Sequence, residues 1–185
     1  MAATGWKNAL HGLLIFGGLG ALVAVPGLVS AALPAEGPPL TGRLDIGYGA
    51  TILPPPGARL DLADARPGTG DVVVLADGAR ITLTARSFRG PADPYLAHAR
   101  HKLERDDMMR PVAAPEPIRT ESGLTGERAS VAATDGSADR GCYTALTAGS
   151  VGVVVLVTSV PDCAGLPPAV RAAVESIKVT EEAAP

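Results

Sequence analysis

The sequence predicts an α+β domain in which an antiparallel sheet is packed with two main helices. Two hairpin patterns and two amphipathic helical patterns follow one another along the chain in the order strands, helix, strands, helix. Since a hydrophobic sheet face and a hydrophobic helix stripe each need covering, this order favours helices packed against an antiparallel sheet. The predicted domain covers residues 46–179, and a polar tail at 180–185 follows it.

An uncharged, mostly apolar run at residues 12–33 precedes this domain. As a helix it would be roughly 33 Å long, which is enough to cross the hydrocarbon core of a bilayer. Lys7 is the one fixed side-chain charge before it, so residues 1–11 are expected in the cytoplasm and the later residues outside. We expect a single-pass signal-anchor in the cell membrane. The alternative is a cleaved signal peptide, with Ser30-Ala31-Ala32 at the cleavage site and the domain secreted.

Residues 34–45 contain three prolines and two glycines and have no apolar periodicity. Proline stiffens and extends a chain, and glycine interrupts regular structure. We therefore predict an extended linker here, with the domain beginning near Ile46.

The first hairpin is predicted at residues 71–88, where Asp77-Gly78 separates two alternating runs. Asp-Gly is a preferred pair for a two-residue type I′ turn, because both central residues need positive φ. One face of the hairpin is then apolar: Val72, Val74, Ala76, Ala79, Ile81 and Leu83. The other face carries Arg80, Thr82, Thr84 and Arg86. This pattern predicts a half-buried antiparallel pair.

A helix is predicted over residues 92–107, with Asp93 as its N-cap. Its apolar stripe is Leu96, Ala99 and Leu103. The prolines of 110–117 end the helical pattern, and two short strands are expected at 118–121 and 127–133.

The second hairpin is predicted at residues 141–160, with its turn near Gly149-Ser150. The five consecutive apolar residues from Val153 to Val157 are typical of a central strand covered on both faces. A last helix is expected at 168–177, because Pro168 suits a first turn and an apolar stripe follows. That stripe is Val170, Ala173, Val174 and Ile177.

This order of elements resembles the PsbP-like fold and, more narrowly, the exported LpqN-type proteins of actinobacteria. The resemblance covers about 130 residues and is carried by six features: an early strand and proline turn (ATILPPPGARL), the Asp-Gly hairpin, a helix with YLAHARHKLE, the turn SGLTG leading into a strand, a valine-rich hairpin, and a closing helix AVRAAVESIKV. It implies a sandwich of helices around an antiparallel sheet, used mainly as an accessory or protein-binding module. It transfers no functional residues.

The only cysteines, Cys142 and Cys163, form an even pair in a domain predicted to be exported, which favours a disulfide. In the register of the second hairpin Cys142 lies opposite Val157, and Cys163 follows just beyond a Pro-Asp turn. Two separate buried thiols are the alternative.

No catalytic, cofactor-binding or metal-ligating residue is predicted. His98 and His101 lie three residues apart on one helix with Glu104 nearby, but any exposed helical face gives such spacing. Ser122 is in no nucleophile elbow, and Gly47-Tyr48-Gly49 precedes a strand rather than linking a strand to a helix, so no nucleotide cofactor is expected.

The function classes follow from charge and anchor. A net charge of -3 disfavours nucleic-acid binding. We expect a membrane-anchored, non-catalytic extracytoplasmic domain, a protein-interaction or accessory module of the cell envelope with a protein partner there. The alternative is a small-ligand or lipid-binding carrier that uses space between sheet and helix. A hydrolase is a distant third.

Overall fold

A computed structural model of the protein describes residues 36–180. The cytoplasmic segment at 1–11, the anchor at 12–33 and most of the tail at 180–185, as predicted above, lie outside these residues. The elements are, in chain order, β1 (Glu36–Pro39), β2 (Leu44–Gly47), β3 (Ala50–Ile52), β4 (Arg59–Asp61), β5 (Asp71–Ala76), β6 (Ala79–Ser87), α2 (Ala92–Asp106), β7 (Met109–Pro111), β8 (Glu116–Arg119), β9 (Thr125–Ala133), β10 (Arg140–Ala148), β11 (Val151–Thr158), α3 (Pro168–Glu175) and β12 (Lys178–Val179). The α+β class is therefore confirmed.

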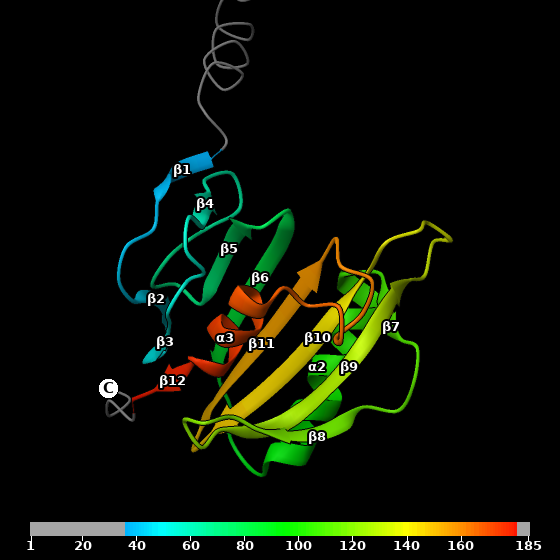
Figure 1. Cartoon of the computed structure of the whole chain (residues 1–185). Coiled ribbons are helices and arrows are strands. Elements are labelled where there is room, and N and C mark those ends of the chain that lie inside the picture. The colour runs from blue at the N-terminus through cyan, green and yellow to red at the C-terminus, as the bar shows by residue number, and fades with distance from the viewer. Residues whose placement is uncertain (1–35, 181–185) are drawn as a thin grey trace, which may run out of the picture. The chain divides into compact units, whose positions relative to one another are not determined.

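The strands form two antiparallel sheets. The main sheet has nine strands in the order β1-β4-β5-β6-β11-β10-β9-β7, and β8 also pairs with β9. A small sheet has the order β12-β3-β2. Figure 1 shows the main sheet as a twisted layer running from β5 to β7, with the small sheet beside β5.

Both predicted hairpins are confirmed. In the first, Ala76 pairs with Ala79, and the turn residues Asp77 and Gly78 have φ of 50° and 75°. In the second, Cys142 pairs with Val157, as the sequence register predicts. The second hairpin places β11 between β6 and β10. Its apolar run is therefore central, as expected.

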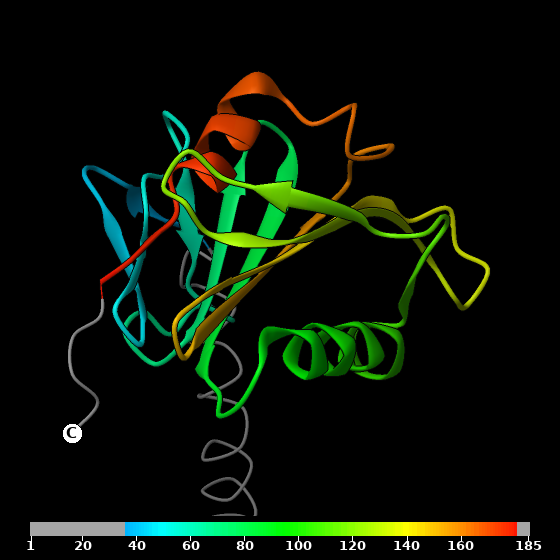
Figure 2. The same ribbon diagram turned by 90° about the horizontal axis from the view of Figure 1, so that it is seen from below.

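The two helices cover opposite faces of the main sheet (Figures 1 and 2). The larger core lies on the α3 face. It is formed by the apolar face of the first hairpin, by the small sheet, and by Val170, Val174 and Ile177 of the last helical stripe. On the α2 face lies a smaller core of Ala99, Leu103, Met109, Ala129, Val131, Tyr143, Ala145 and Leu156. The sheet thus carries two cores, one for each helix.

The segment predicted as a linker contains β1 and the first two residues of β2, so the folded part begins before residue 46. β1 pairs with β4, with an irregular register between Glu36 and Pro39, and β2 belongs to the small sheet. β1 is an edge strand, where a proline without an N–H donor is tolerated. The prolines therefore permit a strand at this position.

Two local predictions near α2 also differ from the structure. Asp93 makes no capping hydrogen bond, and the helix begins after Pro91, whose extended backbone starts the first turn without a side-chain cap. The proline-rich segment after α2 contains β7, which pairs with the end of β9. Pro111 ends this short edge strand, so again the proline occupies an edge.

Neither helix within residues 36–180 is long and apolar enough to cross a membrane. The predicted anchor is not among the residues to which this applies.

Candidate functional site

A cleft of about 410 Å³ lies between α2 and the main sheet. Its walls come from β6, β11, α2 and the segment that joins β6 to α2. The lining residues are Thr82, Thr84, Arg86, Ser87, Phe88, Tyr95, His98, Ala99, Lys102, Leu103, Asp107, Val154 and Leu156. This volume falls within the range of small-molecule sites in proteins, about 300–1,000 Å³.

The floor of the cleft follows from strand alternation. Ile81 and Leu83 of β6 are buried on the α3 face, so Thr82 and Thr84, which alternate with them, face α2. Thr84 is paired with Val154 of β11, which contributes the apolar half of the floor. Figure 2 shows α2 on this face, beside β6. The helix therefore leaves space between its apolar stripe and the polar face of the first hairpin.

An aromatic pair closes one end of the cleft. Phe88 and Tyr95 stack with their ring centroids 4.6 Å apart and an angle of 24° between the rings. The ring of Tyr95 lies over Gly152 of β11, where a Cβ atom would overlap it. Burial raises the pKa of the Tyr95 phenol. The phenol is therefore neutral at physiological pH, so this end of the cleft presents an uncharged aromatic wall.

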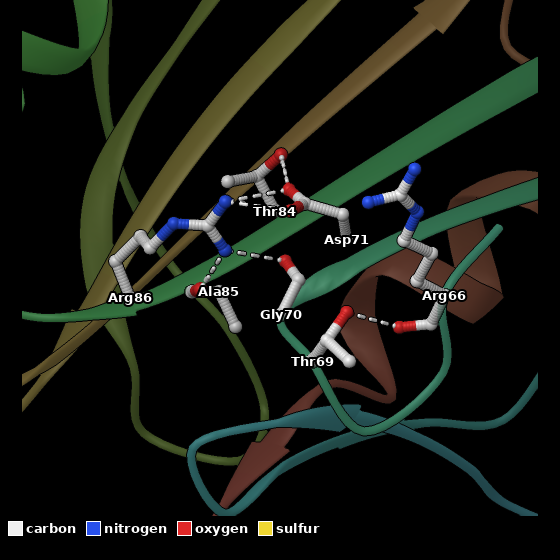
Figure 3. A network of polar contacts seen from close by, with 7 residues as sticks. All are labelled: Arg66, Thr69, Gly70, Asp71, Thr84, Ala85 and Arg86. Atoms are coloured by element: carbon white, nitrogen blue, oxygen red, sulfur yellow. Dashed lines mark hydrogen bonds and ion pairs between the residues drawn. The ribbon is translucent and has the colours of Figure 1, made fainter. Parts of the chain in front are cut away.

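Arg86 lies at the same end, and its donors are almost fully used. Its Nη1 donates to the carbonyls of Gly70 and Ala85 at 2.9 and 2.7 Å. Its Nη2 donates to both carboxylate oxygens of Asp71 at 2.8 and 2.7 Å. Figure 3 shows the guanidinium directed toward Asp71 and Gly70, with Thr84 beside the carboxylate. Of the five N–H groups of an arginine, only Nε–H is left for another partner.

The charged groups on the α2 side of the cleft are unpaired. Within the described part of the chain, the side chains of Lys102 and Asp107 form no ion pair and no hydrogen bond, and no hydrogen bond links His98 to Ser87. Burial raises the pKa of the Asp107 carboxyl, while the nearby Lys102 ammonium opposes that shift. The cleft thus has one unpaired cation and one unpaired acid.

The predicted disulfide is confirmed. Cys142 of β10 is bonded to Cys163, and their Cα atoms are 4.7 Å apart. Cys142 is buried in the larger core, and the Cys163 N–H donates to Ser130 Oγ at 3.1 Å. The bond therefore fixes the segment between β11 and α3 against the sheet.

The other candidates from the sequence do not form a reactive site. No cluster of three metal-ligating side chains exists among residues 36–180, and both His98 and His101 are exposed on α2. Ser122 Oγ donates to the Ile177 carbonyl at 2.5 Å, a contact that joins a turn to the end of α3. The sequence places a ligand space between sheet and helix only in the carrier alternative, and it assigns no lining residues to that space. The signal for those residues is a polar strand face at Thr82 and Thr84, followed by an amphipathic helix.

A buried polar group lies under α2, next to the cleft. The Tyr143 side chain is fully buried, and its hydroxyl has no hydrogen-bond partner. Beside it, Arg100 of α2 and Glu127 of β9 form an ion pair of 3.0 Å. Burial of the Glu127 carboxyl raises its pKa, and Arg100 opposes that shift. The ion pair connects α2 to β9, whereas the Tyr143 hydroxyl forms no hydrogen bond.

We therefore expect Tyr143→Phe to raise the free energy of unfolding by about 1 kcal/mol at pH 7, because a buried unsatisfied hydroxyl is destabilising. Burial, followed by the charge of Glu127, raises the pKa of Tyr143. The folded state thus keeps the phenol proton above pH ~10, where the unfolded state loses it, so stability falls as pH rises through that range.

Urea unfolding at pH 7 and at alkaline pH measures both effects. The Phe variant is expected to lose less stability than the wild type above pH ~10. A lower free energy of unfolding for the variant at pH 7 would show that the hydroxyl has a partner.

The comparisons with known proteins give the fold alone. No protein-family model matches the chain, and no curated protein matches it. The structure is similar to the crystal structure, at 1.50 Å resolution, of a protein from Bacteroides thetaiotaomicron VPI-5482, with a TM-score of 0.51 and 9% sequence identity. The match covers 77% of this chain and 50% of that protein, so the chain spans about half of its length. The resemblance to PsbP-like proteins stays a prediction.

Proposed function

We propose that the domain is a non-catalytic binding module that holds a small amphipathic ligand in the cleft between α2 and the main sheet. The observation that carries this proposal is the cleft itself, whose volume is that of a ligand site and whose floor and helix wall are apolar at Val154, Leu156, Ala99 and Leu103. Polar side chains at its margin suit a ligand with a polar head and an apolar body.

A binding role is favoured over catalysis by the state of the polar groups. Four of the five N–H groups of Arg86 are used by its own chain, and no hydroxyl in the cleft is hydrogen-bonded to His98 among the described residues. A nucleophilic mechanism needs a nucleophile within hydrogen-bond reach of a base.

Export to the cell envelope belongs to the same proposal. The disulfide supports an oxidising compartment, and the apolar run at 12–33 supports a membrane anchor. A protein partner in the envelope, expected from the sequence, stays a prediction.

The test fills the cleft and asks whether binding is lost. In full-length protein in phosphatidylglycerol nanodiscs, a dodecyl maltoside with a photoreactive group on its chain is expected to label peptides of α2 and β11. Val154→Trp is expected to weaken this labelling about tenfold or more, a change of about 1.4 kcal/mol. Val112→Trp is the matched control, because Val112 is 61% exposed and lies outside the cleft. Equal labelling of both variants would contradict the proposal.

A further inference from the structure

Resting on the proposed function, we infer that the ligand of the cleft is a single-chain lipid with a zwitterionic head, whose anionic group binds Lys102 and whose cationic group binds Asp107. Lys102 lies near the end of α2, and Asp107, five residues further on, directly follows its last residue, a rise of about 7.5 Å along the helix axis. Both line the same cleft. The Lys102 ammonium acts electrostatically on the Asp107 carboxyl, but no hydrogen bond or ion pair joins the two side chains. A head with two opposite charges a short distance apart matches this arrangement.

No ion pair among the described residues involves either group, although the Lys102 ammonium acts electrostatically on both Asp106 and Asp107. Asp106, next to Asp107, forms an ion pair of 2.7 Å with Arg105 on the exposed side of the helix. Arg86, the other cation of the cleft, is bound to Asp71 through both carboxylate oxygens. The donors of Lys102 and the acceptors of Asp107 therefore stay available to a ligand.

The apolar part of the cleft extends from this charged end toward the aromatic pair. Leu103 precedes Asp107 by one helical turn. Along β11 the floor runs from Leu156 through Val154 to Gly152, which the Tyr95 ring covers. The helix rises about 10 Å from Tyr95 to Lys102. An extended acyl chain fits such a narrow apolar floor, and the aromatic pair would enclose its terminal methyl group.

The two charges of a zwitterionic head match Lys102 and Asp107 better than the head groups of simpler single-chain ligands do. A fatty acid pairs with Lys102, but its carboxylate lies near the carboxylate of Asp107 and is repelled by it. An alkylamine pairs with Asp107, but its ammonium is repelled by that of Lys102. An uncharged sugar head leaves both charges without a partner. A phosphoethanolamine head offers a phosphate oxygen and an ammonium group two carbons away, and so satisfies both.

The experiment uses four photoreactive probes that share a chain of the same length and differ in the head: lauroyl lysophosphatidylethanolamine, dodecanoate, dodecylamine and dodecyl maltoside. Full-length protein in phosphatidylglycerol nanodiscs is labelled with each, and half-saturation of cleft peptides is compared. We expect the zwitterion to bind most tightly, by about fivefold over the uncharged head.

Two variants assign the charges. Lys102→Gln is expected to weaken the binding of the zwitterionic probe and of dodecanoate about fivefold, and not to weaken the binding of dodecylamine. Asp107→Asn is expected to weaken the binding of the zwitterionic probe and of dodecylamine, and not to weaken the binding of dodecanoate. Both positions are exposed near the end of α2, and an unchanged melting temperature shows that the variants fold.

The outcomes separate this inference from the proposed function. Cleft labelling that depends on Val154 but not on head charge would contradict the zwitterionic head of the ligand and would leave the proposed binding function in place. Tightest binding of dodecanoate, with an effect of Lys102→Gln alone, would overturn it in favour of a plain anion site. Failure of all four probes to label the cleft would remove both.

Discussion

The double variant Cys142→Ala/Cys163→Ser is expected to lower the free energy of unfolding by about 3 kcal/mol, the largest effect expected for any change that leaves the cleft residues intact. The disulfide closes a loop between cysteines 21 residues apart in sequence. Removing it gives the unfolded chain back its freedom, and unfolding becomes more favourable.

The choice of alanine at 142 isolates this effect. Cys142 is 1% exposed in the larger core, so a serine there would bury a hydroxyl and add its own cost. Cys163 is partly exposed in the segment that leads to α3, where serine is tolerated. The variant thus removes the covalent bond with little other change.

Urea unfolding of the variant and the wild type, each with and without reductant, measures the difference. We expect reductant to lower the unfolding midpoint of the wild type toward that of the variant and to leave the variant unchanged. A wild-type midpoint that matches the variant without reductant would show that the bond does not form in the purified protein.

The hairpins could be predicted from the sequence because their determinants are local. Asp77-Gly78 fixes both the turn and the register of the strands beside it, and the register decides which side chains reach the core. Two cysteines and a register that placed Cys142 correctly favour a disulfide, but they leave two separate thiols as the alternative. The bond between Cys142 and Cys163, whose Cα atoms are 4.7 Å apart, decides between them.

The beginning of the domain could not be predicted, because β1 and β2 are held by partners far along the chain. β1 depends on β4, and β2 belongs to a small sheet whose other edge is β12. Leu44 and Ile46 alone are too short a pattern to outweigh three prolines and two glycines. Non-local pairing therefore overrode the local composition.

The residues of the cleft could not be predicted for the same reason, although the carrier alternative places a ligand between sheet and helix. The alternating pattern puts Thr82 and Thr84 on the polar face of a half-buried hairpin, and it does not say what lies over that face. The position of α2 on that face depends on which strands it crosses, since it packs over Tyr143 and Val131 on strands that follow it in sequence. Lys102 and Asp107 gain a role only once the helix is placed.

Gly152→Ala is expected to lower the free energy of unfolding by about 2 kcal/mol and to abolish labelling of the cleft. Gly152 faces α2 from the middle of the sheet, and the Tyr95 ring occupies the place where a Cβ would stand. The ring is also stacked on Phe88, so it has little room to turn away. The first turns of α2 must then shift outward, together with the wall that closes the cleft.

A matched control separates this clash from the general effect of replacing glycine by alanine. At Gly37, also in a strand, the nearest atom to an added Cβ is the end of the flexible Leu62 side chain at 3.2 Å. Gly37→Ala reduces the freedom of the unfolded chain as Gly152→Ala does, but needs no movement of a helix. We expect it to change stability by less than about 1 kcal/mol and to leave cleft labelling intact.

The cause of the effect is decided by a double-mutant cycle with Tyr95→Ala, measured by urea unfolding. Removal of the ring frees the space over Gly152, so Gly152→Ala is expected to cost close to nothing in that background, with a coupling of about 2 kcal/mol between the two positions. An equal cost in both backgrounds would show that the glycine is needed by the strand itself. In that case Tyr95 would not be what fixes the position of α2 against the sheet.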